Sequence, residues 1–175
     1  MGFMAVAYPE IEKKDFDWIQ SIRNAHDPNY AVIAPHFSLV FPVTNIDSRD
    51  FCQHCNKICG AIPKIDFVIG RAIVHRDRDA DDRYVFFTPD EGNSEIILLH
   101  DRLYTGILEK ELRSDIKYIP HITVARTVDE SLCKQLTDAT NRTGINITGR
   151  ITAVDIISIK EDCVFSIAKI PLMGD

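Results

Sequence analysis

Two short segments of this 175-residue chain place a hydroxyl-bearing residue two positions after a histidine. The first contains His36 and Ser38, the second contains His121 and Thr123, and a proline precedes each histidine. Residues two apart on a β-strand point to the same face of the sheet. Each segment therefore predicts a strand that presents an imidazole and a hydroxyl together, with its apolar residues turned toward a core.

A pair of imidazoles suits displacement at a phosphodiester. This reaction needs one group to take a proton from the attacking oxygen and another to protonate the leaving oxygen. Because the unperturbed pKa of histidine is about 6.5, one imidazole can be neutral while the other is protonated near neutral pH. Ser38 and Thr123 can donate hydrogen bonds to the non-bridging oxygens. We therefore predict that His36 and His121 act together on one phosphate, without a metal or other cofactor.

The two segments resemble the paired motifs of the two-histidine (2H) phosphoesterase superfamily, most closely its 2′,5′ RNA ligase-like and cyclic phosphodiesterase branch. The family's first motif, His-x-Thr/Ser-Leu-x-Phe, matches residues 36–41, and its second, His-x-Thr-x-x-Arg, matches residues 121–126. Phe41 and Arg126 complete these motifs. Strict alternation turns both side chains away from the hydroxyls. A role for either in the cleft therefore requires the strand to end or bulge.

The resemblance implies a role for each matched position. His36 and His121 become the acid and base, and Ser38, Thr123 and Arg126 bind the phosphate. The residue at the end of the first motif, Phe41, becomes a base or wall contact. The implied activity is metal-independent action at the ribose 2′-oxygen, by hydrolysis of 2′,3′-cyclic phosphates, by 2′,5′ ligation of RNA ends, or by both. Because the two directions exchange the roles of the histidines, the sequence does not distinguish acid from base.

Apolar periodicity predicts a mixed α and β chain with two similar halves. Each histidine-bearing strand is followed by a helix and then by extended strands. The expected strands are 3–8, 32–43, 65–75, 84–88, 118–124, 147–159 and 163–170, and the expected helices are 10–25, 48–61, 94–109 and 130–140. We predict an α+β fold and a single bilobal domain over residues 1–175, with approximate halves 1–91 and 92–175. The resemblance adds that two pseudo-twofold-related antiparallel sheets line a central cleft, with helices on the outside.

Charge and hydropathy restrict the partners. The formal net charge of −6 argues against a broad basic face that binds duplex DNA, and favours a small nucleotide or an RNA end. No run of residues approaches the roughly 18 apolar residues of a membrane span, and the first residues lack the basic region of a signal peptide. We expect a cytoplasmic protein without membrane contact, monomeric by default.

A cysteine-rich segment offers a competing interpretation. Cys52, Cys55 and Cys59, with His54 among them, are residue types that bind zinc or an iron–sulfur cluster. Their spacing, however, is that of one apolar stripe on a helix, and no matching ligand pair follows. We predict that the stripe packs into the core. The aspartate-rich segment 76–83 lacks the glycine and glutamate of a calcium loop, so we predict a hairpin tip there.

Two alternatives to a metal-free enzyme stay open. A non-catalytic RNA-end or nucleotide-binding module would use the same cleft, and its binding would survive the loss of one histidine. Hydrolysis would instead fall by several orders of magnitude. A hydrolase that used the cysteine segment and the aspartate-rich turn would be sensitive to chelators. Four histidines lack the context of the two motifs and are assigned no role: His26, His54, His75 and His100.

Overall fold

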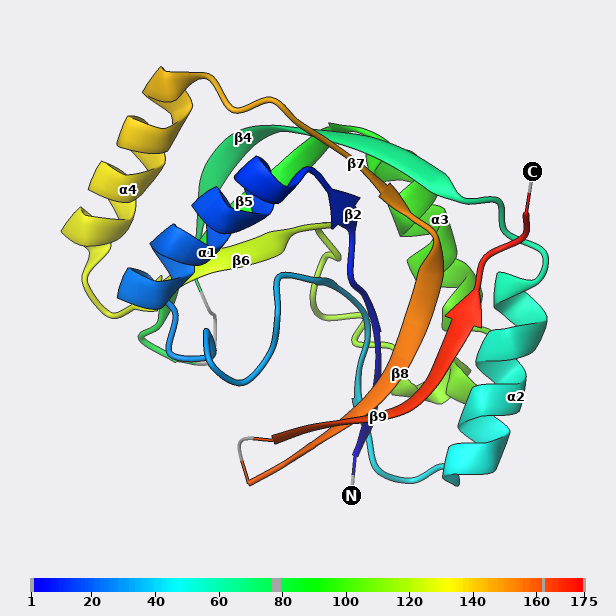
Figure 1. Ribbon diagram of the computed structural model, residues 1–175. Helices are drawn as coiled ribbons and strands as arrows, with labels where there is room; N and C mark the ends of the chain where they lie inside the picture. Colours follow the sequence, from blue (N-terminus) through cyan, green and yellow to red (C-terminus); the bar gives the residue numbers. More distant parts are fainter. Residues whose placement is uncertain (1, 77–79, 162, 175) are drawn as a thin grey trace.

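The computed structural model of the chain describes residues 2–76, 80–161 and 163–174. Two antiparallel sheets dominate it (Figure 1), one with the strand order β3-β1-β8-β9 and the other with the order β2-β7-β4-β5-β6. The strands are β1 (Phe3–Ala7), β2 (Glu10–Ile11), β3 (Phe37–Val43), β4 (Ile65–Arg76), β5 (Arg83–Glu91), β6 (Ile122–Thr127), β7 (Ile147–Ile151), β8 (Ala153–Lys160) and β9 (Cys163–Pro171). The helices are α1 (Lys13–His26), α2 (Ser48–Cys59), α3 (Asn93–Leu103) and α4 (Glu130–Thr143), with the 3-10 helix η1 (Gly106–Glu111) after α3.

The chain runs twice through the same series of elements. The first series is β1, α1, β3 and α2, and the second is β5, α3, β6 and α4. In each series the strand that follows the histidine, β3 or β6, lies at the edge of its sheet, and the first strand of the series lies beside it. This repetition of order and edge position gives the two sheets the pseudo-twofold relation that we expected.

The sheets do not coincide with the two halves of the chain. Strands β8 and β9 complete the sheet of β1 and β3, whereas β4, which follows α2, pairs with β5 and β7. The strand predicted over 147–159 is divided at Thr152, and its two parts belong to different sheets. The boundary predicted between residues 91 and 92 therefore does not separate one sheet from the other. Hydrophobic alternation identifies a strand but not the strand with which it pairs.

Helices cover both sheets, and two of them pack near the motif strands. Helix α1 packs against β6, and α3 packs against β3. Helices α4 and α2 lie on opposite flanks, at the left and right of Figure 1. The helix predicted over 94–109 ends at Leu103, and Gly106 adopts a positive φ of 56° that favours glycine at the turn into η1. Among the described residues, no helix has the length and apolarity required to cross a bilayer.

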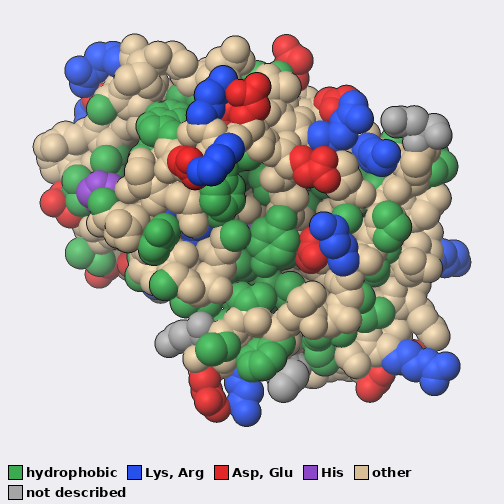
Figure 2. All heavy atoms as spheres, in the orientation of Figure 1, with side chains coloured by type: hydrophobic (Ala, Val, Ile, Leu, Met, Phe, Trp, Pro, Cys, Tyr) green, Lys and Arg blue, Asp and Glu red, His purple; other side chains and the backbone are tan. Residues whose placement is uncertain are grey.

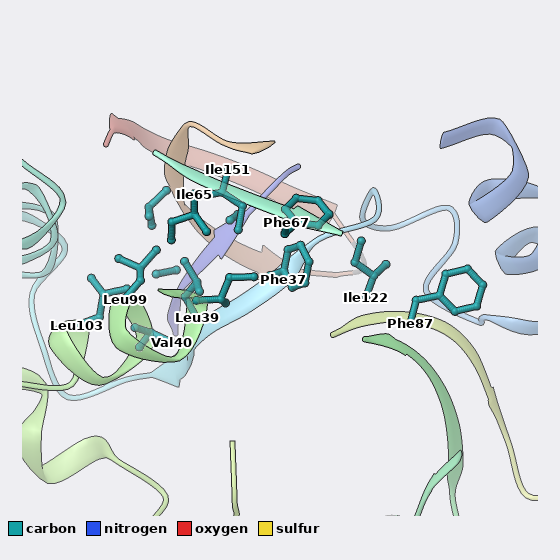
Figure 3. Packing of buried hydrophobic residues seen from close by; sticks show 14 of the residues in the cluster. Phe37, Leu39, Val40, Ile65, Phe67, Phe87, Leu99, Leu103, Ile122 and Ile151 are labelled. Carbon is teal, nitrogen blue, oxygen red and sulfur yellow. The ribbon is translucent and has the colours of Figure 1, made fainter. Parts of the chain in front are cut away.

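The apolar residues of the motif strands point into one shared core (Figure 3). Phe37, Leu39, Ile122 and Val124 are all at most 1% exposed. The ring of Phe37 contacts the ring of Phe67 on β4, with centroids 5.2 Å apart. The core therefore joins both sheets and fixes the strands that carry the predicted chemistry.

The cysteine stripe also belongs to this core, as predicted. Cys55 and Cys59 are 0% exposed, and Cys52 packs against the same cluster. The predicted hairpin between β4 and β5 is present as far as the pair Arg76 and Arg83. Residues 77–79 of its aspartate-rich tip lie outside the described residues. Figure 2 shows charged side chains of both signs interspersed around a hydrophobic middle on the face in view.

Candidate active site

Both histidines lie one residue before their strand begins, and not inside it as predicted. The proline that precedes each histidine has no N–H to extend the ladder. His36 Nδ1 is 2.9 Å from the carbonyl oxygen of Ala34, and His121 Nδ1 is 2.6 Å from that of Ile119. Because a carbonyl oxygen only accepts, each Nδ1 donates and each Nε2 is left to accept or carry a catalytic proton. The two motifs thus fix their imidazoles in the same way.

Both motif strands contain a bulge after the hydroxyl residue. The pairing of β3 with β1 skips Leu39, and the pairing of β6 with β5 skips Val124. In each strand the skipped residue and its successor are both buried. An extra residue reverses the alternation of faces beyond it. The bulges therefore return Phe41 and Arg126 to the side of the hydroxyls, which meets the condition set by the sequence.

Two adjoining pockets lie along the motif strands. The larger, of about 470 Å³, is lined by His121, Phe41 and several further aromatic residues. The smaller, of about 260 Å³, is lined by His36 together with Ser38 and Arg126. Tyr84 and Thr123 line both pockets. All six predicted site residues thus border one or the other of two pockets that share Tyr84 and Thr123, with His121 in the larger and His36 in the smaller.

His121 lies in a stack of rings. Its imidazole is nearly parallel to the ring of Phe86, with centroids 3.6 Å apart, and Phe86 stacks on His75 at 4.9 Å. The pKa of His121 is lowered to about 4, chiefly by burial and in smaller part by positive charge on His36 and His75, while the carbonyl of Ile119 acts in the opposite direction. The imidazole of His121 is therefore neutral near pH 7 in the free protein.

His36 has different neighbours. The ring of Tyr8 meets it edge-on, with centroids 6.2 Å apart. Burial lowers the pKa of His36 as the largest effect, the carbonyl of Ala34 raises it, Arg23 lowers it and Asp27 raises it. Its surroundings thus contain a buried ion pair where those of His121 contain stacked rings.

Two tyrosines form hydrogen bonds with backbone groups on the unpaired edge of β3. The hydroxyl of Tyr118 donates to the carbonyl of Ser38 at 2.9 Å, and the hydroxyl of Tyr104 accepts from the N–H of Phe41 at 2.9 Å. The ring of His100 stacks on Tyr118 with centroids 3.7 Å apart. These residues fix the backbone on either side of the β3 bulge. Sequence reasoning missed them, because it placed Tyr104 in the helix predicted over 94–109 and Tyr118 in the strand predicted over 118–124, and neither pattern indicates a contact with this edge.

The ring stack beside His121 was also missed. His75 was assigned no role, and Phe86 and Tyr84 were interpreted only as strand residues. The available signal was their alternation on β5, which turns both aromatic rings to one face. Both line the larger pocket with His75.

Arg126, which lines the smaller pocket, is held by a carboxylate. Its Nε and Nη2 donate to Asp82 Oδ2 at 2.9 and 2.6 Å. Its guanidinium carbon also lies 5.9 Å from the ring centre of Tyr84. Half-exposed and oriented by these partners, the guanidinium can contribute positive charge to a ligand in the pocket.

The buried thiols of the cysteine stripe are not ionised near neutral pH. Burial raises the pKa of Cys55 and of Cys59, in the latter case to about 11, so both are protonated near neutral pH. His54 lies outside that core and its Nε2 is 2.9 Å from the carbonyl of Leu103. Within the described ranges, no three His, Cys, Asp or Glu side chains gather in a geometry that could hold a metal ion.

Curated relatives of similar length share part of this sequence. A protein from Bacillus licheniformis that carries the name phosphoesterase is 27% identical over 132 residues, which cover 74% of this chain and 73% of that protein. One from Bacillus pumilus with the same name is 29% identical over 139 residues, covering 74% and 72%.

Solved structures share the fold. LigT of Escherichia coli superposes with a TM-score of 0.58 at 16% identity, covering 98% of this chain and 97% of that one. TT0787 of Thermus thermophilus superposes with a TM-score of 0.64 at 10% identity over the whole of both chains. Usb1 of Kluyveromyces marxianus, solved with uridine monophosphate, gives 0.55 at 12% identity over 98% of each chain.

The family model of the 2′-5′ RNA ligase superfamily matches residues 9–162, which include both histidine motifs, all four helices and seven of the nine strands. A match of this extent, to a chain whose paired edge strands, bulges and imidazoles repeat in both motifs, identifies the family. The chain belongs to the 2′-5′ RNA ligase superfamily.

Proposed function

We propose that this chain is a metal-independent phosphodiesterase that acts at the 2′-oxygen of ribose through His36 and His121. Family membership and the named relatives support a phosphoesterase of the LigT type. The observation that carries the finer proposal is the shared geometry of the two imidazoles. The Nδ1 of each imidazole lies within hydrogen-bond distance of the carbonyl oxygen two residues earlier. Each imidazole also borders a pocket that Thr123 helps to line.

The two pockets suggest where the parts of the substrate bind. The phosphate lies at their junction, where Ser38 and Thr123 donate to the non-bridging oxygens and Arg126 adds positive charge. The larger pocket has aromatic walls that suit a nucleobase, and Phe41 forms part of its lining. Structures of LigT with 3′-AMP and of Usb1 with uridine monophosphate show that related folds bind nucleotides, which favours the same ligand class here.

The protonation states of the two imidazoles follow from the burial of both rings. In the free protein, burial favours the neutral form of each imidazole. An anionic phosphate between them raises both pKa values, because an opposite charge within a few ångströms favours the protonated form. The complex then holds one proton on the pair. In cyclic phosphate hydrolysis, the neutral imidazole takes a proton from water and the charged one protonates the leaving ribose oxygen. In ligation a 5′-hydroxyl takes the place of water, and cleavage of the 2′,5′ linkage back to the cyclic phosphate reverses both transfers.

The substrate expected in the cell is a 2′,3′-cyclic phosphate on a small nucleotide or an RNA end, or the corresponding 2′,5′ linkage. The net charge of −6 favours such short ligands over a long polyanion in the cytoplasm. The competing proposal, a nucleotide-binding module without turnover, shares every feature of the cleft. The two proposals differ only in whether the bound nucleotide reacts.

The test offers the purified protein 2′,3′-cyclic nucleotides, 2′,5′-linked dinucleotides and ADP-ribose 1″,2″-cyclic phosphate in the presence of EDTA. We expect turnover by the wild type, with each of His36→Gln and His121→Gln lowering kcat by a factor of about 10² to 10⁴. His26→Gln, at the end of α1, is the matched control and keeps full activity. Nucleotide binding without turnover would favour the binding module, and turnover that EDTA abolishes would refute the metal-free mechanism.

A further inference from the structure

A buried ion pair lies beside the first motif, and no step of the proposed reaction uses it. Arg23, in the last turn of α1, is 2% exposed, and Asp27, the residue after the helix, is 7% exposed. The Nε of Arg23 donates to Asp27 Oδ2 at 2.8 Å, and its Nη1 donates to Gln20 Oε1 at 2.8 Å. A buried pair of this kind is often no more stabilising than apolar residues of similar size. Its presence therefore calls for a reason besides stability.

The same guanidinium also holds the loop that leads to His36. Its Nη2 donates to the carbonyl of Ile33 at 2.7 Å and to that of Asn29 at 3.4 Å. The N–H of Asn29 in turn donates to Asp27 Oδ1 at 2.9 Å. Arg23 and Asp27 together thus fix both ends of the segment 27–33 by charge-assisted hydrogen bonds, which are among the stronger ones in proteins.

The hydrogen bonds of Arg23 and Asp27 hold a peptide group next to the one that contacts the imidazole of His36. The carbonyl next to that of Ile33 belongs to Ala34, and it accepts the hydrogen bond from His36 Nδ1. The guanidinium therefore immobilises the peptide group adjacent to the one that selects the tautomer of His36. Arg23 and Asp27 also line the smaller pocket together with His36.

The helix that carries Arg23 is anchored to the other motif. Helix α1 packs against β6, the strand that begins one residue after His121. Ile19, one turn before Arg23, is 0% exposed and belongs to the main core cluster together with Ile122 of β6. Packing thus connects β6 to α1, and the hydrogen bonds of Arg23 connect α1 to the loop that ends at His36.

We propose that Arg23 is a positioning residue that holds the His36 imidazole in register with His121. Three acceptors, on Asp27, Gln20 and Ile33, receive well-formed bonds from one planar guanidinium. A lysine ammonium has the same charge but cannot reproduce this fork. The inference rests on the proposed function of the two histidines, and its first test does not require activity.

The first test reads the tautomer of His36 by 15N NMR at a pH where the ring is neutral. In the wild type we expect a protonated Nδ1 and an unprotonated Nε2 for both His36 and His121. In Arg23→Lys, the two nitrogen shifts of His36 should move toward each other as the tautomers average, while those of His121 stay in place. Arg150→Lys, which alters an exposed pair with Asp66 across β7 and β4, is the matched control and should leave both rings unchanged.

The second test is kinetic and uses a variant that does not strand a buried charge. The double variant Arg23→Met/Asp27→Asn keeps an oxygen at position 27 to accept from Asn29, so the loop retains one tie. We expect kcat on a 2′,3′-cyclic nucleotide to fall about 100-fold, the cost of a misplacement near 1 Å, with KM changed less than about threefold. A purely structural role would lower the amount of folded protein and leave kcat per folded molecule unchanged.

The outcomes separate the two proposals. If the 15N shifts of His36 in folded Arg23→Lys and in the folded double variant equal those of the wild type, the positioning role is overturned, whatever the activity. Altered His36 shifts in a protein whose wild type turns over none of the offered substrates would leave the positioning role standing and overturn the proposed function. Altered shifts together with a fall in kcat would support both.

Discussion

Acidification should destabilise the protein through His121 in particular. The pKa of this imidazole is about 4 in the native protein and 6.5 in a model peptide. Between these values the unfolded chain binds a proton that the native protein does not. The free energy of unfolding therefore falls as the pH drops from about 6.5 to about 4, and it is insensitive to this group above 6.5.

The magnitude follows from the displacement of the pKa. Each pKa unit corresponds to about 1.36 kcal/mol, so at pH 4, where the native imidazole is half protonated, the loss relative to pH 7 is roughly 3 kcal/mol. This is a large part of the total stability of a typical domain, about 5 to 15 kcal/mol. The ring stack supplies the physical cause, because Phe86 covers one face of the imidazole with centroids 3.6 Å apart.

Urea denaturation of the wild type and of His121→Gln at pH 7 and pH 4 measures this loss. Other groups titrate in both proteins, so the difference between their pH dependences isolates His121. We expect the wild type to lose about 3 kcal/mol more than the variant over this range. Phe51→Leu, a core change on α2 away from the cleft, controls for lower stability as such and should keep the wild-type pH dependence. Equal slopes for the wild type and His121→Gln would refute the argument that burial holds this ring neutral.

Three further predictions concern neighbours of the site and the cysteines. Phe86→Ala exposes the imidazole of His121 to water, so an NMR titration should show its pKa rising from about 4 toward 6.5; an unchanged value would assign the shift to another neighbour. Tyr118→Phe leaves the carbonyl of Ser38 without its hydrogen bond, which should lower the free energy of unfolding in urea by about 1 kcal/mol and raise KM; an unaltered KM would mean that this edge does not position the hydroxyl. In native protein at pH 8, a thiol reagent such as DTNB should label the exposed Cys163 at once and the buried cysteines only after unfolding; rapid labelling of several thiols would contradict the packed stripe.

Features that depend on local chemistry were predictable from the sequence. The cysteine spacing on α2 and the alternation at the start of β4 reflect burial on one face, and the structure confirms both. The residues of the two motifs also emerged, because a histidine and a hydroxyl two apart, repeated in an equivalent context, are rare by chance. Both motif strands lie at sheet edges, and the pockets that they line share Tyr84 and Thr123.

Features that depend on which segments meet in space were not predictable. The split of residues 147–159 at Thr152 leaves no mark on the apolar pattern, since apolar residues recur through both parts. The bulges at Leu39 and Val124 are visible only against the partner strands. The ion pair of Arg23 and Asp27 was hidden for a related reason, because charged residues four apart on a helix are usually solvated.

The comparison of the two motifs shows where specificity can arise in a duplicated site. Both copies reproduce the Nδ1 contact, the hydroxyl and the bulge, so under the proposed function the motif determines which atoms reach the phosphate. Their surroundings differ, with stacked rings beside His121 and a buried ion pair beside His36, so residues outside the motifs determine how readily each imidazole holds a proton. In the proposed mechanism one imidazole starts neutral and the other protonated, although their motifs are alike. The residues that can favour one assignment over the other lie outside the motifs, where a motif search does not detect them.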